Sequence, residues 1–349
     1  MVTPEHRTGA GLLLETLEGP IRHALLDWAL TVGIFDLCAD PAPVDDLAAA
    51  LHLRPDRLLT VLRALAAAGF VRPEAAGFRT APEVLPFVAT GSPRNMVETL
   101  RALATTRHTG LDRIAALLAG GDEAPGKPLF DAAHWDASHR SLAAFHRALA
   151  ADAMEPCLTG LPEWPRARTL LDIGPGSAVL ARRLLARRPD LRVTLFDLPP
   201  VAERIRHDAA DLPVAILGGS YNETLPEGPF DIIWCSMTLY FHDRGLPALI
   251  ARLAERLAPG GVLVSFHEAL TDARTAPPEH VIGRLMPALR SGDTSFTEGE
   301  IARAMAGAGL LRASVETIFT PFGRYRLDSA RKGPARPCSI DPNIAPGGG

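Results

Sequence analysis

A glycine-rich turn between a strand and a helix is the segment whose residue types and spacing most clearly indicate chemistry. Residues 170–178 read LLDIGPGSA: an apolar strand ends at Asp172, and Gly174 and Gly176 allow a tight turn before a helix begins. Such a loop brings backbone N–H groups close to a ligand, either a pyrophosphate or the amino-acid half of a sulfonium nucleotide. The next strand ends at Asp197, whose carboxylate can accept both hydroxyls of a ribose. These elements predict a nucleotide-binding unit and leave the nucleotide open.

A histidine just past another apolar strand is the best candidate for a general base. His242 lies in LYFHDRG, after the strand predicted at 230–239. Imidazole titrates near neutral pH, so it can take the proton of a phenolic or other hydroxyl group. A single histidine at the end of a strand can equally be structural, and the residues alone leave both interpretations open.

A loose set of nitrogen and oxygen ligands raises the question of a metal. The set consists of His242, His267, Glu268 and His280. His267 and Glu268 are adjacent on a predicted strand, so their side chains point to opposite faces and would not both reach one ion. We therefore expect no bound metal.

The elements that position these residues alternate between strand and helix patterns from residue 169 onward. Strands are predicted at 169–174, 192–199, 214–220, 230–239, 261–270, 314–322 and 324–331. Helical patterns lie between most of them, which predicts an α/β fold: a Rossmann-like, doubly wound sheet with helices on both faces. The last two strands follow each other closely, so we expect an antiparallel hairpin at one edge.

The N-terminal block, residues 20–90, shows three helical patterns followed by two short strands, which is the order of a winged helix. Its third helix, PDRLLTVLRALAAAG, has only Arg57 and Arg63 as basic residues. A helix that contacts DNA needs more basic residues than this, so we expect it to pack against a partner chain instead. Residues 94–160 read as mainly helical, and 333–349 are rich in Pro and Gly, which predicts a disordered tail.

The composition is that of a globular protein, with 47% hydrophobic and 22% charged residues among 349. The net charge of −4 favours neither nucleic acid nor an anionic membrane as a partner. The four cysteines show no C-x-x-C spacing, the N-terminus lacks a signal-peptide pattern, and no run of 18 apolar residues occurs. We therefore expect a cytoplasmic protein without a disulfide framework.

Five segments carry a resemblance to a known family. In order they are DIGPGSA (172–178), FDLPPV (196–201), GGSYN (218–222), YFHD (240–243) and LAPGGVLVSFHEAL (257–270). They resemble the motifs of class I methyltransferases, and FDLP is typical of the plant-type and bacterial small-molecule O-methyltransferases. The resemblance implies S-adenosylmethionine bound at the carboxyl ends of the strands and a homodimer formed through an N-terminal winged-helix domain. It divides the chain into a dimerisation domain (12–92), a helical connector contributing to the substrate pocket (93–165), a catalytic domain (166–332) and the tail (333–349).

The resemblance also implies which residues bind the cofactor. Gly174 would lie against the methionine part, and Ser220 stands where the family has the acid that binds adenine. Tyr221 could pack on the adenine, Thr238 replaces a lysine common in plant members, and Ala178 replaces the last glycine of the loop. The expected cofactor-binding residues are Asp172, Gly174, Gly176, Asp197, Leu198, Ser220, Tyr221, Cys235 and Thr238.

Three further residues match the catalytic positions of the family. His242 matches the base, Asp243 follows it as in the family, and Glu268 matches the glutamate that orients the base. A carboxylate beside an imidazole fixes its tautomer and stabilises the imidazolium. The family's substrate-facing positions correspond to Phe145, Leu149 and Asp152, and we expect Met286 to form an apolar wall.

These observations predict an O-methyltransferase that acts on a hydroxylated, aromatic or polyketide-like small molecule of secondary metabolism. The departures at Ala178, Ser220, Thr238 and Arg244 leave open a C- or N-methyltransferase of the same fold, or a homologue that binds S-adenosylmethionine without transferring its methyl group. Relatives that methylate the β-carbon of α-keto acids use a metal-binding histidine, and Ser295 and Phe296 occupy its place here. We expect neither nucleic acid nor membrane as a partner.

Overall fold

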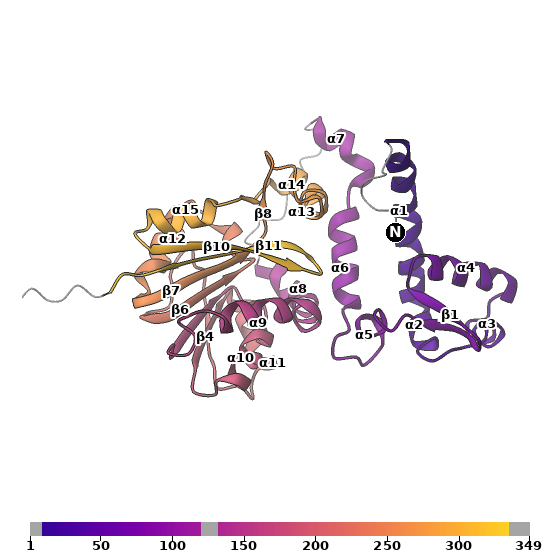
Figure 1. The fold of residues 1–349 in the computed structure, drawn as a ribbon, viewed down its shortest axis with the longest axis horizontal. Helices are drawn as coiled ribbons and strands as arrows, with labels where there is room; N and C mark the ends of the chain where they lie inside the picture. Colours follow the sequence, from indigo (N-terminus) through magenta and orange to yellow (C-terminus); the bar gives the residue numbers. More distant parts are fainter. Residues whose placement is uncertain (1–8, 120–131, 335–349) are drawn as a thin grey trace, which may run out of the picture. The chain divides into compact units, whose positions relative to one another are not determined.

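The computed structural model describes residues 9–119 and 132–334, and of residues 132–137 only the backbone (Figure 1). The chain divides into two compact units, Met1–Arg101 and Ala102–Gly349. The first unit extends past the predicted end of the dimerisation domain at residue 92. Most of the predicted tail, 335–349, and Cys338 within it lie outside the described residues. Among the described residues, no helix is long and apolar enough to cross a membrane.

The first unit contains five helices and a hairpin within the described residues. They are α1 (Gly9–Val32), α2 (Ile34–Leu37), α3 (Val44–Leu51), α4 (Pro55–Ala67), β1 (Val71–Glu74), β2 (Gly77–Thr80) and α5 (Leu85–Val88). β1 and β2 pair antiparallel, so the predicted order of helices followed by a strand pair is confirmed. Proline at the first position of α4 has no N–H to leave unpaired, and Leu58, Leu62 and Leu65 bury one face of that helix.

The helices between the first unit and the sheet differ from the sequence prediction. They are α6 (Val97–His108), which starts in the first unit, the short η2 (Leu111–Arg113), α7 (Ile114–Leu118), α8 (Ala132–Phe145), the π-helical turn η3 (His146–Ala150) and α9 (Ala151–Thr159). The helical pattern predicted across 94–160 is therefore interrupted by a π turn at His146–Ala150. A π turn holds an extra residue, so it changes which side chains share a face before and after it.

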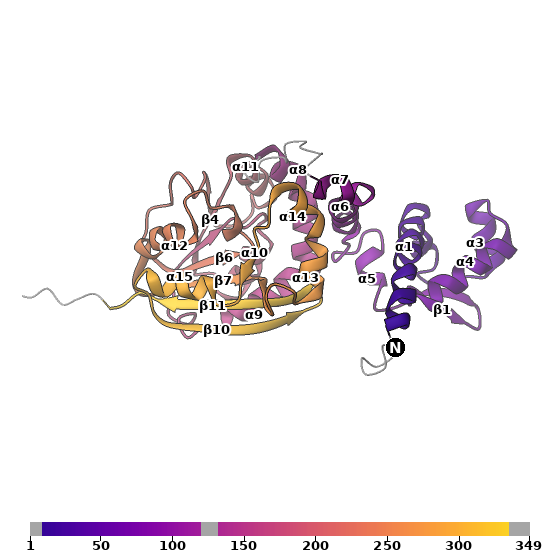
Figure 2. The same cartoon turned by 90° about the horizontal axis from the view of Figure 1, so that it is seen from above.

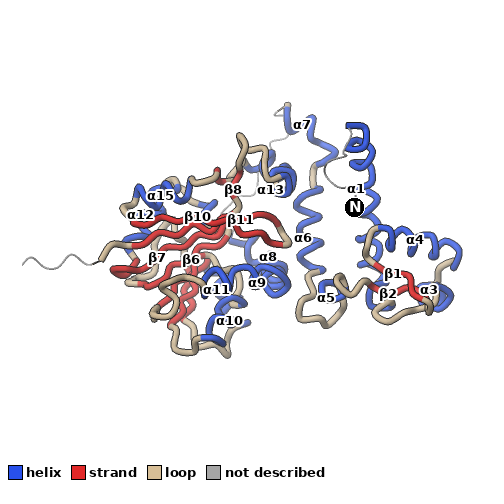
Figure 3. The backbone as a smooth tube through the Cα atoms, in the orientation of Figure 1, coloured by secondary structure: helices blue, strands red, loops and turns tan. Residues whose placement is uncertain are grey.

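The second unit is built on a seven-stranded sheet with the order β10-β11-β7-β6-β3-β4-β5, drawn red in Figure 3. Its strands are β3 (Thr169–Ile173), β4 (Arg192–Asp197), β5 (Ala215–Gly218), β6 (Phe230–Ser236), β7 (Leu257–His267), β10 (Leu311–Thr320) and β11 (Gly323–Arg331). β3 to β7 are parallel, and β10 and β11 form the predicted antiparallel hairpin at the β7 side. The predicted fold class is confirmed.

Helices cover both faces of this sheet (Figures 1 and 2). One apolar cluster joins the sheet to α9, α10 (Val179–Arg187) and α11 (Pro199–Asp208); the other joins it to α12 (Leu246–Glu255) and α15 (Glu300–Gly307). Leu184 and Leu253 are fully buried in opposite clusters, and burying such a side chain contributes about 1.5–3 kcal/mol. The two layers fix the strand ends, where the loops that carry chemistry begin.

The loops after β6 and β7 contain small elements that the sequence did not indicate. They are η4 (Leu239–Phe241), β8 (Ala269–Leu270), α13 (Pro278–Gly283), α14 (Leu285–Ser291) and β9 (Phe296–Thr297), and β8 pairs with β9 in parallel. β7 begins at Leu257 rather than at the predicted Gly261 and ends at His267, so Glu268 follows the strand directly.

Candidate active site

A cavity lies at the carboxyl ends of four neighbouring parallel strands. Each strand end contributes a short run of lining residues: Gly174, Pro175 and Gly176 after β3; Phe196, Asp197 and Leu198 at the end of β4; Gly219, Ser220 and Tyr221 after β5; and Ser236, Met237 and Thr238 at the end of β6. This is the crevice in which open α/β sheets bind their ligands. The sequence prediction of a ligand site at this edge is consistent with the cavity.

The glycine loop after β3 is shaped by close backbone approach. Gly174 and Gly176 have φ of +64° and +63°, a region that glycine enters without the strain of a side chain. A Cβ on Gly174 would lie 2.2 Å from Thr238 Oγ1, so only glycine leaves this part of the cavity open. The Gly174 N–H donates to Phe196 O at 2.8 Å, which ties the loop to the end of β4.

Asp197 accepts hydrogen bonds from the loop on either side of it. Its carboxylate accepts from the Gly176 N–H at 2.8 Å and from the Leu198 N–H at 2.7 Å. Burial raises the pKa of Asp197 to about 6, against the opposing effect of these two N–H groups. The carboxylate is thus oriented at the cavity wall, in the position expected for an acceptor of ribose hydroxyls.

Two predicted cofactor-binding residues, Asp172 and Cys235, are buried beneath the cavity and do not line it. Burial, together with the nearby Asp197 carboxylate, raises the pKa of Asp172 to about 8. Cys235 packs in the apolar cluster with Ile173, and burial raises the pKa of its thiol well above the usual value. Neither side chain lines the cavity, so the predicted direct contact with the cofactor is not supported for either residue. Cys235 is core, and the raised pKa of Asp172 favours its neutral acid near pH 7.

The loop after β5 is fastened to the loop after β6. Tyr221 donates its hydroxyl to Thr238 O at 2.7 Å, and Ser220 Oγ accepts from the Asn222 N–H at 3.2 Å. Asn222 also donates to Phe241 O at 2.8 Å and accepts from the Asp243 N–H at 3.2 Å. The predicted residues Ser220, Tyr221 and Thr238 all line the cavity, so the family position of the missing acid is a serine that faces the ligand space.

His242 directly follows η4 and is not among the residues that line the cavity. Its side chain is half-buried and, within the described part of the chain, makes no hydrogen bond; the preceding Phe241 lines the cavity. Asp243 is exposed, with its carboxylate 4.0 Å from Arg244 Nε. The role of His242 as the base therefore stays a prediction, and Asp243 contributes its backbone N–H to Asn222 rather than a side chain to the cavity.

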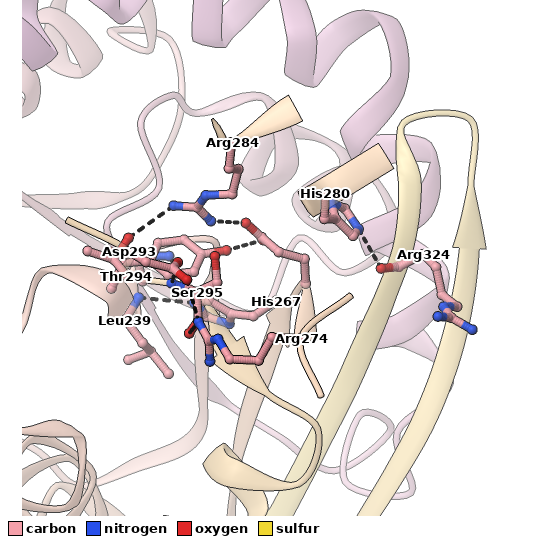
Figure 4. Close-up of polar contacts among 12 residues, drawn as sticks. Leu239, His267, Arg274, His280, Arg284, Asp293, Thr294, Ser295 and Arg324 are labelled. Carbon is pink, nitrogen blue, oxygen red and sulfur yellow. Dashed lines mark hydrogen bonds and ion pairs between the residues drawn. The ribbon is translucent and has the colours of Figure 1, made fainter. Parts of the chain in front are cut away.

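Glu268 is held by an arginine rather than by His242. Its carboxylate accepts from the Tyr240 hydroxyl and from Arg284 Nη1, and Arg284 Nη2 donates to Thr294 Oγ1 at 3.1 Å (Figure 4). Burial favours the neutral acid, but the Arg284 charge and the Tyr240 hydroxyl together hold the pKa of Glu268 below its usual value. No hydrogen bond joins Glu268 to His242 in the described residues; the structure pairs Glu268 with Arg284, and the orienting role stays a prediction.

His267 supports the loop beneath the cavity. Its Nε2 accepts from the Thr238 and Leu239 N–H groups, both at 3.0 Å, and its Nδ1 lies 2.8 Å from Ser265 Oγ (Figure 4). Two donors at Nε2 require the neutral tautomer with the proton on Nδ1, and burial lowers the pKa of His267 to about 3.

Three of the four residues in the loose ligand set are hydrogen-bonded to other protein groups. His280 Nε2 bonds Arg324 O at 2.7 Å (Figure 4), and His267 and Glu268 have the partners given above. Within residues 9–119 and 132–334, no group of three or more His, Cys, Asp and Glu side chains is placed to hold a metal ion.

Of the predicted substrate positions, only Phe145 lines the cavity. Its ring packs edge-to-face on Phe322, with centroids 5.0 Å apart. Leu149 is half-buried and Met286 is buried, and neither lines the cavity. Asp152 is exposed, and its carboxylate accepts from Arg183 Nη1 at 2.7 Å. The prediction that Asp152 faces the substrate is corrected: the π turn changes which side of the helix faces the cavity after Phe145, and Asp152 pairs with Arg183 instead.

Sequence reasoning missed several cavity-lining side chains. They include Leu142, His146, Asn222, Met237 and Phe241. Met237 and Phe241 flank predicted residues and could have been found by proximity. Leu142 and His146 sit on a helix whose facing side depends on the π turn, for which the sequence gives no signal.

Comparisons with known proteins agree with this geometry. Residues 138–311 match the model of a family described as a methyltransferase domain. The chain is 27% identical to the N,N-dimethyltransferase OxyT of Streptomyces rimosus over 86% of this chain and 90% of that protein. It is 28% identical to the tetracenomycin polyketide synthesis 8-O-methyl transferase TcmO of Streptomyces glaucescens, but that match spans about half of each chain, 47% and 50%.

The fold is shared with solved structures. Human N-acetylserotonin methyltransferase in complex with S-adenosylmethionine superposes with a TM-score of 0.71, over 94% of this chain and 99% of that chain, at 20% identity. The residues at the cavity fit that cofactor: Asp197 can accept the ribose hydroxyls, and the loop of Gly174 and Gly176 carries no side chain at these two positions of the cavity wall. The chain is therefore a methyltransferase with S-adenosylmethionine as its cofactor, and it is similar over most of its length to small-molecule methyltransferases such as OxyT.

Proposed function

We propose that the protein methylates a hydroxyl group on a neutral aromatic or polyketide-like small molecule of secondary metabolism. The observation that carries this proposal is the apolar part of the cavity wall, formed by Leu142, Phe145, Met237 and Phe241. Among the described lining residues, Asp197 is the only Asp, Glu, Lys or Arg. An apolar wall without a cation suits an uncharged ring better than an anionic acceptor.

S-Adenosylmethionine supplies a methyl group bound to a sulfonium. The leaving group is then a neutral thioether, which departs readily. The chain holds the acceptor oxygen in line with that methyl group and removes a proton. When the cofactor is bound, the acceptor oxygen would receive the methyl group with release of the neutral thioether S-adenosylhomocysteine, and His242 would take the hydroxyl proton. Asn222 holds the backbone on both sides of His242 through Phe241 O and the Asp243 N–H, which fixes the approach of the imidazole.

The experiment is to compare His242→Ala and His242→Gln with the parent protein on a panel of hydroxylated aromatic acceptors. We expect S-adenosylhomocysteine formation to fall by about 100-fold or more, a typical contribution of a general base, while the Kd of S-adenosylhomocysteine stays unchanged. Full activity in His242→Ala would remove His242 from the base role. Acceptor turnover without S-adenosylhomocysteine would indicate a homologue that does not transfer the methyl group.

An amine acceptor is the second candidate, and the pairing of Glu268 with Arg284 favours it. An imidazole without a carboxylate partner is a weaker base, and a neutral amine attacks the methyl group before it loses a proton. The similarity to a protein named as an N,N-dimethyltransferase supports the same reading. A matched pair of hydroxyl and amino aromatics tests it: N-methylation would persist in His242→Ala, whereas O-methylation would not.

We also propose that the protein is a cytoplasmic homodimer with no nucleic-acid or membrane partner, assembled through its first unit. Four apolar side chains on α1, Leu13, Leu14, Leu17 and Ile21, are 72, 67, 68 and 62% exposed in the single chain. Exposed apolar stretches of this kind mark protein contacts. Light scattering on the parent and on Leu17→Glu/Ile21→Glu tests this: a parent that is monomeric at micromolar concentration would refute the dimer.

A further inference from the structure

The π turn η3 directs a histidine into the cofactor cavity. His146 is the first residue of this turn; its side chain is 8% exposed and lines the cavity beside the glycine loop. A Cβ built on Gly176 would lie 3.7 Å from His146 Cε1, so the ring lies against the loop backbone. π turns within helices occur frequently at functional sites.

The partner of this histidine sets which ring nitrogen carries the proton. His146 Nδ1 lies 2.7 Å from Ser177 Oγ, and Ser177 Oγ accepts from the Val179 N–H at 3.4 Å. With its oxygen used as an acceptor, the Ser177 hydroxyl is free to donate to Nδ1. The ring proton then sits on Nε2, which has no partner among the described residues and is left as a donor for a ligand.

The His146 ring is neutral, which suits a position near the sulfonium cation of S-adenosylmethionine. Burial, and then the charges of His139 and Arg147, lower the pKa of His146 to about 4, so the ring is neutral at physiological pH. A neutral imidazole donates a hydrogen bond without repelling the sulfonium of S-adenosylmethionine. A protonated histidine or a lysine at this position would place a like charge next to it.

The layout of the cavity tells which part of the cofactor lies at His146. Asp197, at the end of β4, fixes the ribose, and Ser220 and Tyr221 follow β5 on one side of it. The rest of the molecule must then extend to the other side of Asp197, toward the ends of β3 and β6, where His146 and the glycine loop lie.

We propose that His146, held by Ser177, binds the carboxylate of the amino-acid half of S-adenosylmethionine through its Nε2–H. The inference rests on the methyltransferase function and assigns one of its binding residues. The competing role for His146 is contact with the acceptor, since Phe145 beside it lines the apolar wall. The two roles differ in which ligand loses affinity when the imidazole is removed.

The test compares two ligands that share adenosine and a thioether sulfur. S-Adenosylhomocysteine carries the amino-acid half, and 5′-methylthioadenosine lacks it. Calorimetric Kd values for both are measured on the full chain and on His146→Phe, which keeps a ring but has no donor. His146→Gln, whose amide can donate from a similar position, is the matched control, and Ser177→Ala removes only the group that sets the tautomer.

We expect His146→Phe to weaken S-adenosylhomocysteine by about tenfold or more, as for a lost hydrogen bond to a charged group, and to leave 5′-methylthioadenosine unchanged. His146→Gln should recover most of the loss, and Ser177→Ala should show a smaller loss of the same kind. Equal effects on both ligands, or no effect on either, would overturn the proposal. A raised KM for the acceptor with unchanged S-adenosylhomocysteine binding would assign His146 to the acceptor instead. Failure of the parent protein to bind either ligand would refute the cofactor assignment itself.

Discussion

Breaking the ion pair between Arg284 and Glu268 tests what the acid after β7 does. In Arg284→Met, the apolar length of the side chain is kept and the charge is lost. The Glu268 side chain is only 8% exposed, so its carboxylate would stay buried with one partner, the Tyr240 hydroxyl. Removing one partner of a buried pair costs about 3–5 kcal/mol. Because Arg284 itself is 29% exposed, we take the lower end, about 3 kcal/mol.

The double variant Arg284→Met/Glu268→Gln is the matched control. It removes both charges, and the amide oxygen of glutamine can still accept from Tyr240. We expect it to recover most of the free energy of unfolding lost in Arg284→Met. In thermal unfolding, 3 kcal/mol corresponds to a lowering of Tm by about 6–12 °C for a domain of this size.

Acid pH gives a second signature of the pair. The folded pKa of Glu268 is lowered, so its contribution to stability is present above the unfolded pKa of about 4.3 and is lost as pH falls through the folded value. The difference in stability between the parent and Arg284→Met should therefore shrink below about pH 4. Urea unfolding at pH 7 and at about pH 3 measures it.

Steady-state formation of S-adenosylhomocysteine decides between a structural and a catalytic Glu268. If the acid only binds Arg284 and Tyr240, kcat of the double variant should follow its stability back toward the parent value. A double variant that recovers its Tm but keeps a kcat about 100-fold below the parent would refute this reasoning. It would restore Glu268 to the role of orienting His242.

Three further changes test the cavity. Gly174→Ala places a Cβ 2.2 Å from Thr238 Oγ1 at a backbone φ of +64°. Calorimetry should therefore show that S-adenosylmethionine binds at least about tenfold more weakly. An unchanged Kd would show that the loop relaxes and that glycine is not required at this position. The parent should bind S-adenosylmethionine more tightly as pH rises from 6 to 9, because the sulfonium cation favours the ionised form of Asp172, whose pKa is about 8. In Asp172→Asn, the Kd should depend less on pH. An equal pH dependence of the Kd in both proteins would contradict this role of Asp172. Asn222→Ala removes both side-chain hydrogen bonds that hold the backbone around His242, so kcat should fall by about tenfold with little change in the Kd of the cofactor. Weaker cofactor binding with an unchanged kcat would contradict this positioning role of Asn222.

The parts of the fold that the sequence predicted depend on local patterns. Parallel strands buried on both faces read as apolar runs, and glycines near their ends mark the turns, so the sheet and its closing hairpin could be placed. Gly174, Gly176 and Asp197 were predicted to line the site for the same reason, since each lies at the end of a strand or just after it. The residues expected to bind the cofactor could therefore be predicted from local sequence patterns.

The remaining corrections involve information that no local pattern carries. Cys235 lies on a strand buried on both faces, where apolar residues do not alternate, so the sequence does not show which face its thiol takes. The π turn at His146–Ala150 depends on how the helix packs, and it decides that Phe145 faces the cavity while Asp152 pairs with Arg183. Such features follow from tertiary packing and appear only in the structure.

The pairing of Glu268 with Arg284 narrows the acceptors that His242 could serve. In a His–carboxylate pair, the acid stabilises the imidazolium that forms when the proton is taken. His242 has no such partner within the described residues, so transfer of the proton must be driven more by the acidity of the acceptor. A phenol, with a pKa of about 10, loses its proton far more readily than an aliphatic alcohol, and a neutral amine needs no prior deprotonation. The proposed role of His242 as the base therefore predicts phenolic or amine acceptors rather than aliphatic alcohols, and the apolar wall around Phe145 and Phe241 is consistent with an aromatic ring carrying either group.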